Sequence, residues 1–244
     1  MRVKQVLYGL LIGLLTSCSG YTKKDGKVYL RSSNEARIGV EYTEVVADYE
    51  TFEVIDHDIN IDLAKDKKHV YKGTSILIDA DPNTFEQIEN YYWKDKDHVY
   101  LLQFGGDNCK INGADPGSFE VIKDFLWTKD KNHVYYEFKK LLDVDPAEFT
   151  ALEEDWGKDN NFYFYHNLKV DSLDYSTAEI VSRYYIKDKN HVFFKDTIVY
   201  DANPGTFKAD GAGSFGHDDT YMFDWEKNKG PITEKYKRTY IDKK

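Results

Sequence analysis

The sequence has few of the residues that crosslink or stiffen a small fold, and few that bind polyanions. It contains 2 cysteines and 5 prolines in 244 residues. A disulfide framework is therefore excluded, because two cysteines can form at most one bridge. Basic residues are also in deficit, since 33 Lys and Arg stand against 43 Asp and Glu, for a net charge of −10. This balance argues against nucleic acid as a partner and against adhesion to anionic lipid head groups.

The chain also has no recognisable catalytic signature. Gly-x-Ser-x-Gly, His-Glu-x-x-His and glycine-rich phosphate loops are all missing from the sequence. We therefore predict no catalytic residues and no cofactor, and we expect the protein not to be an enzyme. The alternative is an envelope enzyme that acts on polysaccharide with a site built from scattered residues.

The N-terminal residues are typical of an export signal. Arg2 and Lys4 precede an apolar run from Val6 to Leu15, which is too short to span a bilayer stably. The run ends in Leu15-Thr16-Ser17-Cys18, the pattern of a bacterial lipobox. We predict a lipoprotein signal peptide over residues 1–17, with Cys18 carrying acyl chains that anchor the protein in a membrane. The alternative is an ordinary secretory signal with Cys18 incidental.

This prediction sets the compartment and the state of the second cysteine. A lipidated Cys18 places the protein in a bacterial cell envelope, on the periplasmic or surface face of a membrane. Cys109 is then the only thiol left, so it cannot form an intramolecular bridge. Burial is the commoner state for a lone cysteine, although a reactive or intermolecular thiol is the alternative.

One phrase recurs along the remainder of the chain and indicates a repeat architecture. Taken by the aspartate of each Lys-Asp pair, the copies lie at Asp66, Asp95, Asp130, Asp159 and Asp188, with spacings of 29, 35, 29 and 29 residues. Degenerate copies begin at Lys24-Asp25 and Asp218-Asp219. Seven units result, and units of this kind bury their apolar faces by stacking on neighbours. The longer spacing places an insertion at residues 104–109.

A second signature follows each copy. It reads Asp81-Pro82-Asn83-Thr84-Phe85, Asp115-Pro116-Gly117-Ser118-Phe119, Asp145-Pro146-Ala147-Glu148-Phe149 and Asn203-Pro204-Gly205-Thr206-Phe207, with proline-less versions at Asp48 and Asp174. Asp or Asn before Pro is typical of a helix start. We predict one short helical turn in each unit, with its Phe in the core.

Between the signatures the pattern is that of strands. Val-Tyr or Phe-Phe runs are followed by two-residue breaks such as Lys72-Gly73, His166-Asn167 and Lys195-Asp196, which predicts hairpins. A large residue three positions before each aspartate, such as Trp127, should end the preceding strand. The predicted fold is mainly β, with tandem repeats of about thirty residues stacked in a solenoid-like array. A closed propeller-like ring is the alternative, although thirty residues is short for a four-stranded blade.

The two signatures together resemble the bacterial DKNYY family. Asp130-Lys131-Asn132 and Tyr135-Tyr136 match the core that names it, with His133-Val134 between them. The resemblance covers most of residues 18–230, which we take as one repeat domain followed by a basic tail over residues 231–244. It implies an exported or envelope-associated bacterial protein and assigns no catalytic or binding residues. The chain departs from the pattern at Phe162, which stands where His is expected.

Three groups of residues that could suggest a metal site or a catalytic site are better explained by structural roles. His69, His98, His133 and His191 share one repeat position, but equivalent hairpins lie too far apart for one metal ion, so we expect half-buried side chains that bond to backbone. Asp95-Lys96-Asp97 lacks the glycine and distant Glu of a calcium loop. Glu153-Glu154-Asp155 and Asp218-Asp219 are acid pairs that 43 acidic residues make unavoidable.

The function that these observations favour is binding. We expect a non-catalytic lipoprotein that presents its repeat surface to a protein or glycan partner, as a scaffold or by neutralising a basic toxin or enzyme. Most aromatic residues occupy repeat positions and are expected in the core. Phe104, in the insertion, is the aromatic candidate for a surface role, and further functional residues should lie where the copies differ.

Overall fold

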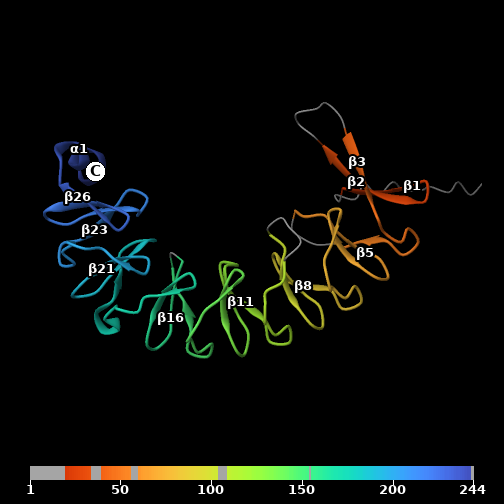
Figure 1. Ribbon diagram of the computed structural model, residues 1–244, viewed down its shortest axis with the longest axis horizontal. Coiled ribbons are helices and arrows are strands. Elements are labelled where there is room, and N and C mark those ends of the chain that lie inside the picture. The colour runs from red at the N-terminus through yellow and green to blue at the C-terminus, as the bar shows by residue number, and fades with distance from the viewer. Residues whose placement is uncertain (1–19, 34–39, 56–59, 104–108, 154, 243–244) are drawn as a thin grey trace, which may run out of the picture. The chain divides into compact units, whose positions relative to one another are not determined.

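The computed structural model describes residues 20–33, 40–55, 60–103, 109–153 and 155–242. The chain divides into two compact units, Met1–Phe85 and Glu86–Lys244. Within the described residues, seven small antiparallel sheets follow one another in tandem, two in the first unit and five in the second (Figure 1). The prediction of a mainly β fold built from seven repeated units is confirmed.

The first unit contains a three-stranded and a four-stranded sheet. The strands of the first sheet are β1 (Tyr21–Lys24), β2 (Lys27–Ser33) and β3 (Val40–Val45). Those of the second are β4 (Glu53–Val54), β5 (Leu63–Lys65), β6 (Val70–Lys72) and β7 (Ser75–Ile76). Asp25 and Gly26 both have positive φ (50° and 76°) in the turn from β1 to β2, a backbone suited to a tight hairpin.

The second unit continues the same meander five times. Its first sheet comprises β8 (Glu86–Glu89), β9 (Tyr92–Lys94) and β10 (Val99–Leu101). Two four-stranded sheets follow, β11 (Glu120–Lys123), β12 (Trp127–Lys129), β13 (Val134–Tyr136) and β14 (Lys139–Lys140), then β15 (Thr150–Ala151), β16 (Trp156–Lys158), β17 (Tyr163–Tyr165) and β18 (Leu168–Lys169).

The last two sheets complete this unit. They are β19 (Glu179–Ile180), β20 (Tyr185–Lys187), β21 (Val192–Phe194) and β22 (Thr197–Ile198), and β23 (Lys208–Asp210), β24 (Phe215–His217), β25 (Tyr221–Asp224) and β26 (Lys227–Pro231). Strands of two to five residues let four of them fit in about thirty residues. A repeat of about thirty residues is therefore long enough for a four-stranded sheet.

The predicted hairpin breaks are present. His166 and Lys195 have positive φ (54° and 59°) directly after β17 and β21, so each starts a tight two-residue turn. In the first unit the turn is one residue later than predicted, because β6 includes Lys72. The large residue before each Lys-Asp also differs from expectation. Trp127 begins β12 and does not end a strand, and Thr128 and Lys129 continue it.

The second signature forms a single turn in most repeats. Thr84, Ser118, Glu148 and Thr206 each donate a backbone N–H to the carbonyl oxygen three residues earlier. Within the described residues only the Asp174 signature extends this turn into a 3₁₀ helix, η1 (Tyr175–Thr177). In the other signatures the predicted helical turn is therefore a single hydrogen-bonded turn and not a helix. The prediction for its Phe is confirmed, because Phe52, Phe85, Phe119, Phe149 and Phe207 are buried.

The buried Phe occupies space above the middle residue of the next strand. A Cβ added to Gly157 would lie 2.4 Å from Cζ of Phe149, and one added to Gly216 would lie 2.4 Å from Cζ of Phe207. In the Asp174 signature the Phe is replaced by Ala178, which packs in the same cluster as Ile186. The signature residue is small and the strand residue is large in this repeat, which is the reverse of Phe149 and Gly157. The pair still combines one small and one large side chain, as close packing requires.

Within each unit, consecutive sheets share a hydrophobic cluster. Val28 and Val45 of the first sheet pack with Phe52 and Tyr71. In the second unit, one cluster combines Tyr92 with Phe119 and Tyr135, another combines Trp127 with Phe149 and Phe164, and two more link β16–β17 to β20–β21 and β20–β21 to β25. Neighbouring sheets of one unit therefore bury apolar side chains against each other.

The C-terminal residues cover the last sheet. A short helix α1 (Glu234–Tyr236), which continues as the helical segment η2 (Lys237–Ile241), buries Tyr236 so that its hydroxyl donates to Asp210 Oδ2 (2.8 Å) and to the Gly216 carbonyl (2.9 Å). Tyr236, within the predicted basic tail, is therefore fixed to the last sheet. Neither this helix nor any other formed by the described residues is long and apolar enough to cross a membrane.

The Phe149–Gly157 contact predicts a strong effect of one methyl group. Gly157→Ala should lower the free energy of unfolding by about 1–3 kcal/mol, because the Phe149 ring leaves no room for a Cβ. Urea unfolding measures the effect. The double variant Gly157→Ile with Phe149→Ala, which copies the Ala178–Ile186 arrangement, should recover most of the loss. A neutral Gly157→Ala would contradict the packing described.

Candidate functional site

A buried aspartate stands at the centre of every repeat after the first, in which Asp25 is exposed. Asp66, Asp95, Asp130, Asp159, Asp188 and Asp218 are only 2–5 % exposed. A buried carboxylate is stable only when hydrogen bonds replace the water that it loses. The bonds that each aspartate receives therefore show which repeats are complete.

The Asp130 repeat illustrates the full set. Oδ1 accepts the backbone N–H groups of Asn132 (2.7 Å) and His133 (2.8 Å), which closes the predicted Asp-Lys-Asn turn. Oδ2 accepts the hydroxyl of Tyr135 (3.0 Å) and the backbone N–H of Asp115 in the preceding signature (2.9 Å). One carboxylate thus joins the two signatures of the repeat.

The same bonding controls ionisation of the carboxylate in the first unit. Burial by itself raises the pKa of Asp66, but N–H donors from Asp48, Lys68 and His69 and the Tyr71 hydroxyl outweigh it and hold the pKa below its ordinary value. Burial and the hydrogen bond to Asp66 in turn raise the pKa of Tyr71. The Tyr71 hydroxyl lies 2.6 Å from Asp66 Oδ2.

The repeated histidines have a local role in the turn. His69, His98 and His133 are half-buried, as predicted, whereas His191 is exposed. Their backbone N–H groups donate to the aspartate. Nδ1 of the first three lies 3.3–3.4 Å from the hydroxyl of the tyrosine two residues on, and does not bond to backbone as expected. Within the described part of the chain, no group of three or more His, Cys, Asp and Glu side chains could hold a metal ion.

A lysine bridges the two signatures on the outside of three repeats. Lys67 pairs with Asp48 (2.6 Å), Lys189 pairs with Asp174 (2.6 Å), and Lys131 pairs with Asp115. The hydrogen bond from the ammonium group, supported by hydroxyl and N–H donors, lowers the pKa of Asp48 and of Asp174 to about 2. The signature aspartate of a complete repeat is therefore neutralised by its own chain.

The Asp159 repeat departs from this pattern at its lysine. Asn160 stands where the Asp66, Asp130 and Asp188 repeats have lysine, and its side chain donates to Glu148. Phe164 lacks the hydroxyl of Tyr135, as do Phe193 and Phe223 in the two repeats that follow. Oδ1 of Asp159 still accepts the N–H groups of Asn161 (2.8 Å) and Phe162 (2.7 Å), but among the described residues no hydrogen bond reaches Oδ2.

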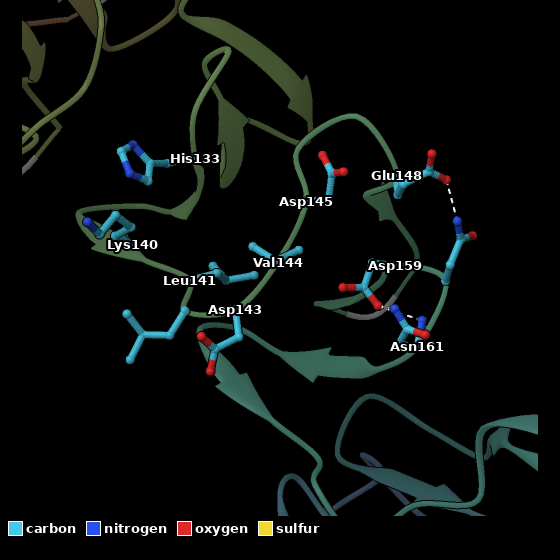
Figure 2. A pocket seen from close by; sticks show the side chains of 11 residues that line it. His133, Lys140, Leu141, Asp143, Val144, Asp145, Glu148, Asp159 and Asn161 are labelled. Carbon is cyan, nitrogen blue, oxygen red and sulfur yellow. Dashed lines mark hydrogen bonds between the residues drawn. The ribbon is translucent and has the colours of Figure 1, made fainter.

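A cavity of about 500 Å³ lies where these contacts are missing. Residues 140–148 line one side and residues 159–161 the other, with His133 at one end. We call it the Asp159 groove. Figure 2 shows one carboxylate oxygen of Asp159 held by a hydrogen bond and the other directed toward Val144 and Asp143. Leu142, at 69 % exposure, adds an apolar side chain to the open lining.

The groove is rich in acceptors and negative charge. Asp143, Asp145, Glu148 and Asp159 contribute carboxylates, and Lys140 is the one lysine or arginine among the lining residues. Asp145 is exposed, whereas its equivalents Asp48, Asp115 and Asp174 are partly buried beneath their lysines. Its Oδ1 accepts the N–H of Ala147 (2.9 Å), and no ion pair reaches it from the residues that the structure describes. The arrangement suits a cationic hydrogen-bond donor.

In a second polar cluster the carboxylate of Asp155 is already paired with Arg183, whereas Nε2 of His166 has no hydrogen-bond partner among the described residues. Asp155 Oδ2 lies 2.6 Å from Nη2 of Arg183 and 3.5 Å from Nε2 of His166. The imidazole stacks on the rings of Tyr136 and Tyr165, with centroids 4.0 and 4.2 Å away. Burial lowers the pKa of His166 against the opposing effect of Asp155, and burial beside Asp155 raises the pKa of Tyr165 to about 12. This cluster links two sheets and leaves no free charge.

The sequence-based site predictions fall into three groups. Cys18 and Phe104 lie outside the described residues. Cys109 is 3 % exposed, which agrees with the predicted burial. The residues of the Asp159 groove were not predicted individually, although Asn160 could have been found by aligning the copies, because the repeats on both sides have lysine at its position.

The hydroxyl–aspartate bond predicts a pH-dependent loss of stability. Tyr71→Phe should lower the free energy of unfolding by about 1.5–3 kcal/mol at neutral pH, because a charged buried acceptor loses a donor. The folded pKa of Asp66 is depressed, so this contribution is complete above the unfolded pKa of about 3.9 and disappears as the pH falls through the folded pKa. Urea unfolding as a function of pH measures it. Tyr163→Phe, the same change at a partly exposed ring, is the control and should be neutral.

Comparison with known proteins agrees with the repeat pattern. The model of the DKNYY family matches residues 12–104 and 92–227. No curated protein and no solved structure matches the chain. Because the two matched segments together cover most of the sequence and the seven repeated sheets lie within or beside them, the chain belongs to the DKNYY family.

Proposed function

We propose that this protein is a non-catalytic, lipid-anchored component of a bacterial cell envelope that binds a protein or glycan partner through its repeat surface. The Asp159 groove is the observation that carries the binding proposal. It is an open cavity with exposed polar and apolar side chains, and it lies in the repeat that lacks the contacts bridging its neighbours. Concave sites with a few convergent polar groups are the usual places for ligands.

The anchor is supported by the sequence. Leu15-Thr16-Ser17-Cys18 is a lipobox pattern, preceded by an apolar run too short to span a bilayer. Cys18 is the lipidation site in this proposal, and residues 1–17 are the signal peptide. These residues lie outside the described structure, so the proposal rests on their sequence.

We also propose that the repeats stack as a solenoid-like array. The shared clusters between consecutive sheets support stacking. The helix that buries Tyr236 on the last sheet supports an open end, because in a closed ring the last sheet would have to pack against the first sheet. Small-angle X-ray scattering distinguishes the two forms. A maximum dimension that matches a compact ring would contradict the array.

An enzyme acting on an envelope polysaccharide is the second candidate. The observation that favours it is the presence of four carboxylates in one groove, since glycoside hydrolysis uses a pair of carboxyl groups. Cleavage of purified envelope polymer by the protein, lost in Asp145→Asn or Glu148→Gln, would establish this activity and exclude the binding proposal.

Crosslinking in the intact envelope tests the binding function. A photo-crosslinking residue placed at Leu142, which is exposed in the groove, should capture a specific partner. The same residue at Tyr200, exposed at 74 % but outside the groove, is the control. Equal products from both positions, or none from either, would argue against the groove as a binding surface.

The anchor has a separate test. Cys18→Ala should release the protein from the membrane fraction, because no acyl chains can be attached at that position. Fractionation and metabolic labelling with a fatty acid measure the change. Cys109→Ala, which leaves the lipobox intact, should fractionate with the unmodified protein. Unchanged fractionation of Cys18→Ala would refute lipid anchoring through this residue.

A further inference from the structure

We propose that the Asp159 groove binds the ammonium group of a lysine side chain from a basic polypeptide partner, which takes the place of the lysine missing at position 160. The inference rests on the proposed binding function and names the chemistry that one site would recognise. Three independent features of the groove support it.

The first feature is the precedent within the chain. Lys67, Lys131 and Lys189 each place an ammonium group on the signature aspartate of their own repeat. In the Asp159 repeat the aspartate is retained as Asp145, but the lysine is replaced by Asn160. The last repeat also lacks the lysine, but there Asn203 replaces the signature aspartate, and Asp219, at the lysine position, accepts the hydroxyl of Thr206. Among these repeats only the Asp159 repeat keeps the anionic half of the bridge alone.

The second feature is an acceptor left open toward the groove. Within the described structure Oδ2 of Asp159 accepts no hydrogen bond, although the residue is only 5 % exposed. In the Asp66, Asp130, Asp188 and Asp218 repeats the same oxygen accepts the N–H group of the preceding signature. The oxygen of Asp159 is not sealed from solvent, so a ligand in the groove can reach it. An ammonium group has three donors and can serve this oxygen together with Asp145.

The third feature is the balance of charge and shape. Lys140 lines the groove and Lys169 Nζ lies 3.9 Å from Asp143 Oδ2, so the four carboxylates still leave an excess of negative charge, which favours a cation over a neutral glycan hydroxyl. Leu141, Leu142 and Val144 add apolar surface, which suits the aliphatic stem of a lysine. A cavity of about 500 Å³ also exceeds what an ammonium group alone fills, so we commit to a polypeptide segment and treat a free polyamine as the competing source.

Restoring the lysine of the repeat provides the sharpest test. Asn160→Lys should form the bridge to Asp145 that the other repeats have and so block the groove from within. Asn190→Lys is the matched control, because it makes the same change in the equivalent turn of the next repeat, one position further on and outside the groove. Both variants gain the same charge. Asn160→Lys should keep or raise the melting temperature, which shows that any loss of binding is not a loss of fold.

The measurement uses the full chain in detergent and a blocked peptide with one lysine between glycines. Calorimetry at low salt should show binding that Asn160→Lys weakens at least tenfold and that Asn190→Lys changes less than twofold. Asp145→Asn should weaken binding about fivefold to tenfold, since the turn bond to Ala147 survives while the charge is lost. Added salt should weaken binding further. Amide shifts on titration should concentrate in residues 140–148 and 159–161.

The controls separate the possible failures. A peptide with norleucine in place of lysine should not bind, and equal binding would overturn the role of the ammonium group. Binding of spermidine that equals or exceeds that of the peptide would overturn the polypeptide source. Equal affinity in Asn160→Lys would overturn the site. A partner crosslinked elsewhere in the envelope, with no peptide binding, would remove this inference and leave the proposed binding function intact, whereas polymer cleavage would remove both.

Discussion

The buried aspartate of the Lys-Asp phrase is the interaction on which the architecture depends. Its Oδ1 closes the hairpin turn by accepting two backbone N–H groups, and its Oδ2 reaches the signature that precedes the hairpin. A carboxylate at 2–5 % exposure is tolerated only because these donors replace water. Strands of two to four residues are too short to hold a sheet together alone, so the aspartate supplies a fixed point that strand pairing lacks.

Packing carries the same register from one sheet to the next. The Phe of each signature enters the neighbouring sheet, where Gly157 and Gly216 leave room for Phe149 and Phe207. Ala178 and Ile186 show that the requirement is for a combined volume and not for a particular residue. Each cluster draws on consecutive sheets, which explains why one repeat could not bury its apolar face alone.

A site emerges where this scheme is incomplete. The complete repeats neutralise their own charges with Lys67, Lys131 and Lys189, so their surfaces offer little to a partner. The Asp159 repeat retains the acids but loses the lysine and the N–H donor to Oδ2 of its buried aspartate, and the groove lies at that position. The Asp155 cluster also contains a carboxylate, but Arg183 forms an ion pair with it. The difference between the two places is the presence of an internal cation, which makes the groove the better candidate for recognition.

Much of the architecture could be predicted from the sequence, because the same local residue patterns recur in several repeats. Asp-Lys-Asn turns, two-residue hairpin breaks and the buried Phe of each signature follow from side-chain hydrogen bonding and apolar periodicity. The extent of Trp127's strand and the length of the signature turn were less predictable, because pairing across a sheet decides where short elements end. The candidate site was harder still, since Asn160 and Phe164 look like ordinary substitutions in a line of letters.

The sequence by itself determined the repeat, its turns and its core residues, because these depend on contacts between residues close in the chain. Tertiary structure alone decided that Asp145 and Asp159, 14 residues apart, line one cavity with an acceptor left open. It also decided that Tyr236 is fixed to Asp210 and Gly216 in a segment whose composition indicated only a basic tail. The physical reason is that aligned copies can show that a lysine is absent, but not which acceptor atoms its absence leaves open or whether they lie in one cavity. The open acceptors become visible only when the groups that should have met are placed in space.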